Sequence, residues 1–300
     1  MKNSTSKRSR FFALLCALLS STIGLTARAE EARPIDGIAD NSFLIEEAYN
    51  QDPGVVQHIF TGLYGEERDN DPQRRSWAFG FTQEWPIFSL RHQFSYTIPF
   101  SFTREGKDHQ DGVEDILLNY RFQALAESER IPAFAPRFSL ILPSGSRDEG
   151  TGSGVVGYQW NLPFSKKVAS RFALHANFGL AYLPDTRVPV EGEDGEDNPT
   201  GHLSPQRSLV SYNLGASGIF ALSSRFHLML EWVGNFEESL NDEGREEHDF
   251  NAVISPGARA AVINQDKLQM VLGVAAPVGL TRPADNYGVF LYLSVEHNFL

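Results

Sequence analysis

Six arginines stand at the ends of short segments in which apolar and polar residues alternate. They are Arg91, Arg121, Arg137, Arg171, Arg225 and Arg259. Each occupies one of the polar positions in the alternation of its segment, and each lies close to a short connection between segments. A guanidinium group is charged at any physiological pH, so a ring of arginines in a pore favours anions. The alternative is that these side chains pair with a carboxylate such as Glu84, or with lipid headgroups.

Two polar stretches of the chain are rich in carboxylates. Residues 237–249 hold seven acidic residues and one arginine, and residues 191–197 hold five acidic residues. Carboxylate oxygens on loops can bind Ca²⁺ or Mg²⁺, the ions that crosslink lipopolysaccharide. The spacing around Asp194 does not follow an EF-hand, so a solvated loop without a defined metal site is the favoured interpretation.

The alternation that places the arginines predicts β-strands. Within residues 225–236, Phe226, Leu228 and Leu230 share one parity, whereas His227 and Glu231 share the other. A period of two residues gives a strand one apolar and one polar face. Such segments are predicted at residues 55–64, 75–85, 88–103, 113–123, 135–143, 154–162, 171–183, 208–222, 225–236, 249–262, 267–278 and 287–299.

The connections between these segments alternate in length. Residues 86–87, 163–170, 223–224 and 264–266 are short connections, with 124–134 as the exception in this set, and the connections between them are polar and mostly longer. Outer-membrane barrels have short periplasmic turns and long extracellular loops. The pattern predicts an all-β fold, a transmembrane antiparallel up-and-down β-barrel of about 12 strands with periplasmic termini. A soluble β-sandwich, the alternative, would not need apolar residues at its outward positions.

Residues 1–29 predict export. Basic residues between Lys2 and Arg10 precede a short apolar run, and Ala27-Arg28-Ala29 is a cleavage motif. This arrangement is typical of a cleaved secretory signal peptide. The single cysteine, Cys16, lies inside it, so the exported chain has neither disulfides nor thiolate chemistry. Loss of the five basic residues makes the net charge of −12 more negative by five, which disfavours nucleic acid as a partner.

Residues 30–54 form a periplasmic segment between the signal peptide and the predicted barrel of residues 55–300. By the predicted topology, this segment enters at the mouth that carries the arginines. It is too apolar for a free tail, yet two carboxylates lie at its centre. It is therefore a candidate plug, in which Phe43, Glu46, Glu47 and Tyr49 would seat the segment and the carboxylates would pair with arginines. Part of the first strand, or a disordered linker, is the equal alternative.

The last predicted strand has an outward series of apolar residues. Tyr287, Val289, Leu291, Leu293, Val295 and Phe299 share one parity. The series resembles the C-terminal signature that the bacterial barrel-assembly machinery reads, although Leu300 follows Phe299 and His297 interrupts the series. The expected partners are therefore the barrel-assembly machinery, outer-membrane lipid and lipopolysaccharide, together with a small-molecule solute.

The sequence offers few residues in arrangements that are typical of an enzyme. A lipid-active barrel enzyme would need Ser, His and Asn or Asp near the outer rim of the lipid-facing surface. His92 occupies a position that would face lipid, but it lies near a short turn and not near the outer rim. His175 and His227 occupy positions that would face the lumen, where they would line the pore. Gly150–Gly154 lacks the strand-to-helix context of a phosphate-binding loop. No catalytic residue, metal site or cofactor is predicted.

Five stretches of the chain carry a resemblance to a known family. They are Asp40–Gln51, Gly54–Ile59, Asp115–Gln123, Arg137–Pro143 and Gly150–Gly154. They resemble an outer-membrane family linked to meta-pathway phenol degradation and often described as transporters. The resemblance implies passage of small solutes, aromatic compounds among them, and assigns no functional residues. With the arginines, it predicts a channel or uptake protein for small aromatic or anionic solutes with a weak anion preference. The alternative is a structural or adhesive barrel whose lumen is filled by side chains.

Overall fold

The computed structural model describes residues 37–38, 42–67, 74–190, 202–241, 244–281 and 287–299. The chain divides into two units, residues 1–32 and residues 33–300, and every described residue belongs to the second. The predicted signal peptide, the acidic residues of 191–197, Asp40 and Leu300 lie outside the described residues. Within the described ranges, no helix is long and apolar enough to cross a membrane.

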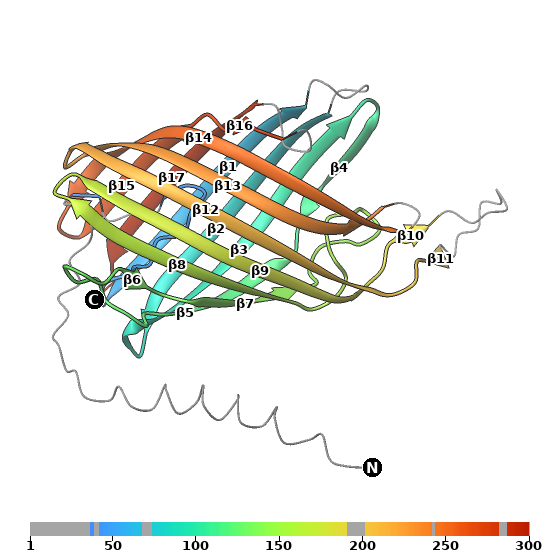
Figure 1. The fold of residues 1–300 in the computed structure, drawn as a ribbon, viewed down its shortest axis with the longest axis horizontal. Helices are drawn as coiled ribbons and strands as arrows, with labels where there is room; N and C mark the ends of the chain where they lie inside the picture. Colours follow the sequence, from blue (N-terminus) through green and yellow to red (C-terminus); the bar gives the residue numbers. More distant parts are fainter. Residues whose placement is uncertain are drawn as a thin grey trace, which may run out of the picture. The chain divides into compact units, whose positions relative to one another are not determined.

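Twelve antiparallel strands close into one barrel (Figure 1). The continuous strands are β1 (Val55–Glu67), β2 (Arg74–Ile87), β3 (Ser89–Glu105), β7 (Arg137–Leu142), β8 (Gly157–Ala169), β9 (Phe172–Thr186), β12 (Arg207–Ser223), β13 (Phe226–Leu240), β14 (Glu246–Gln265) and β17 (Tyr287–Asn298). The fourth strand consists of β4 (Asp108–Val113) and β5 (Ile116–Phe122), which both pair with β3. The eleventh consists of β15 (Leu268–Ala275) and β16 (Val278–Gly279), separated at Pro277, which has no N–H for the ladder. The short strands β6 (Ala133–Phe134), β10 (Pro189–Val190) and β11 (His202–Leu203) lie in connections.

The barrel closes between its first and last strands. β1 pairs with β17 from Val55 against Asn298 to Glu66 against Tyr287. The other spanning strands pair with their neighbours in sequence, so the up-and-down order predicted from the alternation is confirmed. The first and last residues of the barrel lie at the same end as the turns at 88, 170–171, 224–225 and 266–267, which is called the short-turn end below.

Several predicted strand boundaries were wrong because pairing continues where the apolar alternation stops. β8 runs to Ala169 instead of ending near residue 162, so the turn after it is only 170–171. β13 and β14 extend to Leu240 and back to Glu246, with Glu237 opposite Asp249. Many of the carboxylates of 237–249 therefore lie on a paired hairpin, where both faces meet water and no apolar parity is required.

Apolar side chains occupy the outward positions of the barrel. They include Phe60, Phe79, Phe102, Trp160, Phe178, Tyr212, Phe220, Leu228, Leu230, Leu272, Val274, Val289 and Leu291, all exposed. On β13, Leu230 is 52% exposed, whereas its neighbour Met229 is 5% exposed and faces inward. A surface this apolar fits lipid tails and does not fit water.

Candidate functional site

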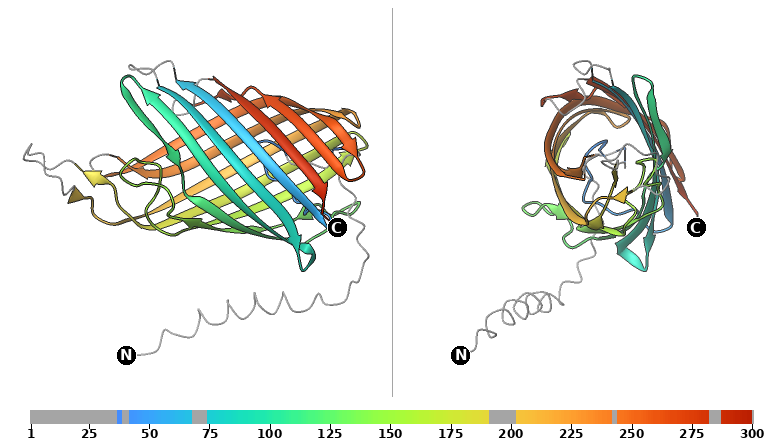
Figure 2. Two further views of the ribbon diagram at one scale, coloured as in Figure 1. Left: turned by 180° about the vertical axis from the view of Figure 1, so that it is seen from behind. Right: turned by 90° about the vertical axis from the view of Figure 1, so that its right-hand side faces the viewer.

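The segment that precedes β1 lies inside the barrel. Its described residues 42–51, called the lumen segment, contact side chains of β3, β5, β8, β9, β12, β13, β14 and β17. These strands surround the lumen, so a segment that touches all of them must lie within it. Figure 2 (right) looks along the barrel and shows this segment in blue inside the ring of strands.

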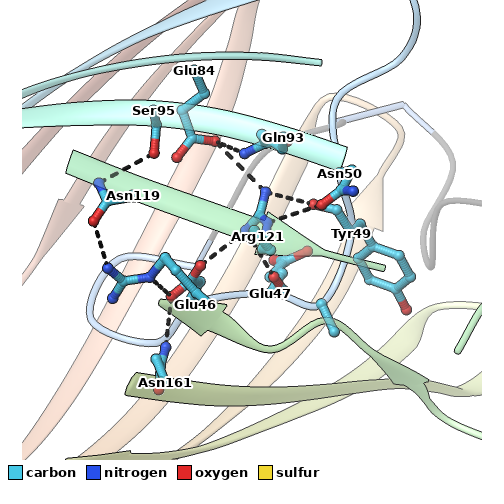
Figure 3. A network of polar contacts seen from close by, with 12 residues as sticks. Glu46, Glu47, Tyr49, Asn50, Glu84, Gln93, Ser95, Asn119, Arg121 and Asn161 are labelled. Carbon is cyan, nitrogen blue, oxygen red and sulfur yellow. Dashed lines mark hydrogen bonds and ion pairs between the residues drawn. The ribbon is translucent and has the colours of Figure 1, made fainter. Parts of the chain in front are cut away.

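Glu46 lies at the centre of a polar network on one wall of the lumen (Figure 3). Its carboxylate accepts hydrogen bonds from Arg137 Nε at 2.8 Å, Arg121 Nη1 at 3.1 Å and Asn161 Nδ2 at 2.6 Å. The Asn177 carboxamide accepts the Glu46 amide at 2.7 Å and donates to the Glu46 carbonyl at 2.8 Å. These partners come from β5, β7, β8 and β9, so one residue of the segment binds four strands.

Arg121 binds the backbone of the lumen segment as well as its carboxylate. The side chain is 2% exposed. Its Nη1 donates to the Glu47 carbonyl at 3.2 Å, its Nη2 to the Tyr49 carbonyl at 2.8 Å, and its Nε to Asn50 Oδ1 at 3.0 Å. A guanidinium group has five donors in a rigid plane, so Arg121 fixes the path of residues 47–50. Glu84, which the sequence analysis named as an alternative partner, lies 3.7 Å from Arg121 Nη2.

Glu47 reaches β9 and β14. Its Oε1 lies 3.8 Å from His175 Nε2 and 3.9 Å from Arg259 Nη2, and it accepts from the Ser42 hydroxyl at 3.4 Å. The two neighbouring glutamates therefore contact different sets of strands, and together they hold the segment across the lumen.

A serine of β8 and a histidine of β9 meet beside the lumen segment, close to the Glu47 carboxylate. The Ser165 hydroxyl lies 2.8 Å from His175 Nδ1 and accepts the Ala48 amide at 2.8 Å. Ser165 is 1% exposed and His175 is 3% exposed. Because the serine oxygen accepts the Ala48 amide, this cluster helps to position the backbone of the segment.

Glu231 of β13 holds the beginning of the lumen segment. Its Oε1 accepts three consecutive backbone amides, from Phe43 at 3.1 Å, Leu44 at 3.0 Å and Ile45 at 3.3 Å. Consecutive amides that converge in this way form a nest for an anion. The Glu231 carboxylate of the wall thus occupies this nest and fixes the backbone of residues 43–45.

Two apolar side chains of the segment fit over glycines in the wall. A Cβ on Gly273 would fall 2.2 Å from Phe43 Cζ, and one on Gly215 would fall 2.1 Å from Ile45 Cδ1. Phe43 also packs against two inward rings of β17, with centroid distances of 5.3 and 5.1 Å. Full burial of a phenylalanine side chain contributes about 1.5–3 kcal/mol. The packing over these glycines therefore adds apolar contacts to the ion pairs and hydrogen bonds that hold the segment.

Tyr49 contacts the long connection between β5 and β7. Its hydroxyl donates to Glu127 Oε2 at 2.6 Å, and Lys166 Nζ lies 3.0 Å from the other oxygen of Glu127. Burial, together with the hydrogen bond to the Glu127 carboxylate, raises the pKa of Tyr49, which therefore stays a neutral donor. The one long connection at the short-turn end thus holds the segment from that side.

The charge state of Glu46 is set by its partners. Burial alone would raise the pKa of its carboxyl group, but the guanidinium groups of Arg137 and Arg121 and the hydrogen bond from Asn161 outweigh burial and lower it. Glu46 is therefore ionised while the segment is docked, and its two cation partners are neutralised.

Three of the six arginines predicted to face the lumen gather around the segment. Arg121 and Arg137 pair with Glu46 at 3.1 and 2.8 Å, and Arg259 lies 3.9 Å from Glu47. Of the candidate plug residues, Phe43, Glu46 and Glu47 contact strands of the barrel wall, and Tyr49 contacts the connection between β5 and β7.

The other three arginines lie apart from this network. Arg91 is exposed, donates to the carbonyls of Gln123 and Ala124, and lies over the Phe122 ring at 4.9 Å. Arg171 and Arg225 are exposed turn residues just before β9 and β13. Arg171 and Arg225 were predicted as the first residues of their strands, and β9 and β13 begin one residue later.

The sequence analysis missed the residues of the wall that receive the segment, chiefly Glu231, Ser165 and Asn177. One signal was present in the sequence. Phe290 and Tyr292 take the inward parity of β17, where a water-filled lumen would favour polar residues. Both are 4% exposed, because Phe43 covers them.

A cavity of about 500 Å³ lies beside the lumen segment. Leu44, Ile45 and Glu46 form one part of its lining, and Glu67 and Arg74 extend it toward the long-loop end of the barrel. The lumen is therefore filled where the segment docks and hollow beyond it.

Comparison with solved structures places this fold among outer-membrane barrels. The crystal structure of the COG4313 outer membrane channel from Pseudomonas putida F1 has a TM-score of 0.62 and 13% identity, covering 84% of this chain and 98% of that chain. The translocator domain of the autotransporter NalP from Neisseria meningitidis has a TM-score of 0.52 and 12% identity, covering 83% and 90%. The beta domain of the Bordetella autotransporter BrkA has a TM-score of 0.51 and 9% identity, covering 83% and 100%.

No protein-family model and no curated protein sequence matches the chain. The class follows from the closed twelve-strand sheet and its apolar outward surface: the chain is an outer-membrane β-barrel protein. Its structural neighbours include channels as well as autotransporter domains, so the particular function rests on the contents of the lumen.

Proposed function

We propose that this protein is an outer-membrane channel for small solutes, closed at its short-turn end by its own lumen segment. The observation that carries the proposal is the way residues 42–51 are seated. Glu46 and Glu47 pair with arginines of the wall, while a cavity of about 500 Å³ remains beyond them. A segment held by ion pairs and hydrogen bonds can leave without unfolding the barrel, because the strand ladder does not include it.

The orientation supports a gate on the periplasmic side. Barrels of this class have short turns in the periplasm, and both ends of this barrel lie at the short-turn end. The segment would then enter from the periplasm, where the predicted signal peptide is removed. The outward apolar surface fits lipid, and contacts with lipopolysaccharide and the barrel-assembly machinery stay expectations from the sequence.

The class of solute expected from the sequence, aromatic or anionic, stays a prediction. Arginines in a pore attract anions, but Arg121 and Arg137 are paired with Glu46 while the segment is docked. An anion preference would therefore be weak in the closed state and stronger once the carboxylates have left.

A structural or adhesive barrel is the second candidate. Ile219, Met229 and Val271 are buried inward-facing residues that pack in one apolar cluster with Phe43, as in a barrel whose lumen is filled. This candidate requires that removal of the segment leaves no conducting path.

Deletion of residues 31–50 separates the two candidates. We expect the deletion variant, reconstituted in planar bilayers, to conduct several-fold more than the full-length protein. The heat-dependent shift in gel mobility, which reports folded barrels, is the control for assembly. A folded deletion variant with unchanged conductance would contradict the gate and favour the filled barrel.

A disulfide lock tests whether the segment moves in the intact protein. The hydroxyl oxygens of Ser42 and Ser217 lie 3.2 Å apart, and the exported chain has no cysteine of its own. The double variant Ser42→Cys/Ser217→Cys should therefore tether the segment to β12. We expect no openings under oxidising conditions and normal openings after reduction, with Ser42→Cys alone as the matched control. Openings that persist in the oxidised double variant would show that gating does not involve this segment.

A further inference from the structure

A row of asparagines crosses the wall of the lumen cavity. Asn213, Asn235 and Asn251 are direct neighbours across β12, β13 and β14. Asn161 of β8 continues the row, with Gly179 of β9 between it and Asn213. A Cβ on Gly179 would fall 2.3 Å from Asn213 Oδ1, so the glycine leaves space for that carboxamide. All four asparagines line the cavity, which therefore has one wall of uncharged hydrogen-bonding groups.

Two oxygens of this row are buried acceptors without a protein donor in the described part of the chain. They are Asn161 Oδ1 and Asn251 Oδ1. The amide nitrogens of both side chains are engaged, since Asn161 donates to Glu46 at 2.6 Å and Asn251 donates to Glu237 at 3.3 Å. Carboxylates accept and do not donate, so each oxygen is left facing away from its carboxylate partner. A buried acceptor without a donor is unfavourable, so each carboxamide would gain a hydrogen bond by turning toward a ligand hydroxyl group in the cavity.

The ionic groups around the cavity are paired with one another. Arg74 Nη1 lies 2.9 Å from Glu67 Oε1, and Arg137 Nε lies 2.8 Å from Glu46 Oε2. An ionised ligand would have to break one of these pairs or enter without a counter-charge. The cavity therefore favours an uncharged ligand.

The rest of the lining is largely apolar. Leu44 and Ile45 of the segment, together with Leu63, Val253 and Pro277 of the barrel, contribute to it. A molecule that fits this site has hydroxyl groups along one edge and C–H groups on a face. A sugar-like ring has both, and a volume of about 500 Å³ lies in the range of small-molecule pockets.

We propose that this cavity is a binding site for an uncharged cyclic polyol of monosaccharide size. Hydroxyl groups of the ring donate to Asn161 and Asn251, carboxamides of Asn213 and Asn235 contact further hydroxyls, and the apolar lining covers the C–H face. The role of this site in a path for solutes rests on the proposed function. Binding itself requires only the docked segment and does not require that the gate opens.

Calorimetry on the full-length protein tests the site independently of conductance. The probes are D-glucose and D-glucuronate, which share a ring and differ by a carboxylate, in a detergent without a sugar head group. We expect saturable glucose binding and at least about tenfold weaker binding of glucuronate, the size of effect that one unpaired charge or lost hydrogen bond produces. Equal or tighter binding of glucuronate would overturn the uncharged class, and no saturable binding of either probe would overturn the site.

Variants of the row locate the binding. Asn235→Leu and Asn251→Leu should each weaken glucose binding about tenfold, since each removes a hydrogen-bonding group from the cavity. Asn298→Leu, at an exposed position near the short-turn end, is the matched control and should bind glucose normally. If a leucine variant fails the gel-mobility test of folding, the smaller change Asn235→Ala replaces it. Glucose binding that is unaffected by these changes would place it elsewhere.

Discussion

In the proposed gate, the buried ion pairs between the lumen segment and the wall hold the segment in its docked position. Glu46 contacts two guanidinium groups, Arg121 and Arg137, and Arg121 is 2% exposed. Removing one partner of a buried pair leaves an uncompensated charge, at a cost of about 3–5 kcal/mol. The same pairs contribute less net stability when they are intact, because desolvation opposes them. They are therefore suited to a contact that can be switched.

Glu46→Gln should open the channel at neutral pH. The substitution removes the charge but keeps the size of the side chain, and it weakens docking by roughly 3 kcal/mol if the arginines stay in place. Single-channel recording should show a higher open fraction than in the unmodified protein. Glu129→Gln, an exposed residue in the 123–136 connection, is the control and should leave gating unchanged. Normal gating in a folded Glu46→Gln variant would remove this ion pair from the mechanism.

Acid should have the same effect as Glu46→Gln. The pKa of Glu46 is lowered in the docked segment, so its contribution to docking is complete above the ordinary value of 4.5. As pH falls below that value and through the lower docked pKa, protonation favours the undocked segment. Conductance of the full-length protein should rise over this window. The Glu46→Gln variant should lack that part of the response, and an identical acid response in both would assign it to other groups.

At the scale of the strand, alternation separates a face toward lipid from a face toward the lumen. Leu230 and Met229 are adjacent on β13, yet they are 52% and 5% exposed. The inward face is not uniformly wet, because Met229 packs in the apolar cluster near the segment, whereas Asn235 lines the cavity. One strand thus meets lipid, packed side chains and a cavity along its length.

Leu230→Arg should impair assembly, whereas Asn235→Arg should be tolerated. A charge on the lipid face near the middle of the bilayer costs about 2–4 kcal/mol, but an arginine at residue 235 would extend into the cavity. The heat-dependent shift in gel mobility measures the folded fraction of each variant. Equal folding of the two variants would contradict the assigned orientation of β13.

At the scale of the whole molecule, the barrel and its N-terminal segment form one electrostatic unit. Arg121, Arg137 and Arg259 face carboxylates of the segment, so these three cations of the wall have counter-charges while the segment is docked. The segment therefore occupies part of the lumen and pairs with cations of its wall.

Deletion of residues 31–50 should therefore change selectivity along with conductance. With Glu46 and Glu47 gone, the guanidinium groups of Arg121, Arg137 and Arg259 would raise the local anion concentration. The reversal potential in a salt gradient should shift toward anion selectivity relative to the full-length protein. The variant that combines the deletion with Arg121→Gln, Arg137→Gln and Arg259→Gln should lose the shift. Cation selectivity of the deletion variant, unchanged by those substitutions, would exclude the arginines as the cause.

The amino-acid sequence alone determined the barrel and the direction of its side chains. Alternation is local, since residues on one face of a strand are two apart, and the pattern of β13 or β17 can be read without knowing its neighbours. The same parity placed Arg121, Arg137 and Arg259 on the inner wall. Where strands leave the membrane, as in the β13–β14 hairpin beyond Glu237, lipid no longer imposes the pattern and the predicted boundaries were wrong.

Only the tertiary structure decided which inner residues meet. The Glu231 nest, the packing of Phe43 over Gly273 and the asparagine row join residues that are distant in sequence, through the register of a closed sheet and a segment folded into it. The alternation shows on which face of a strand a residue lies. It does not show how far along the barrel axis that residue lies or which residue faces it across the lumen. For that reason Arg91, Arg171 and Arg225 share a parity with Arg121 and yet lie outside the network. These contacts depend on distances across the lumen, and the spacing of residues along the chain does not determine those distances.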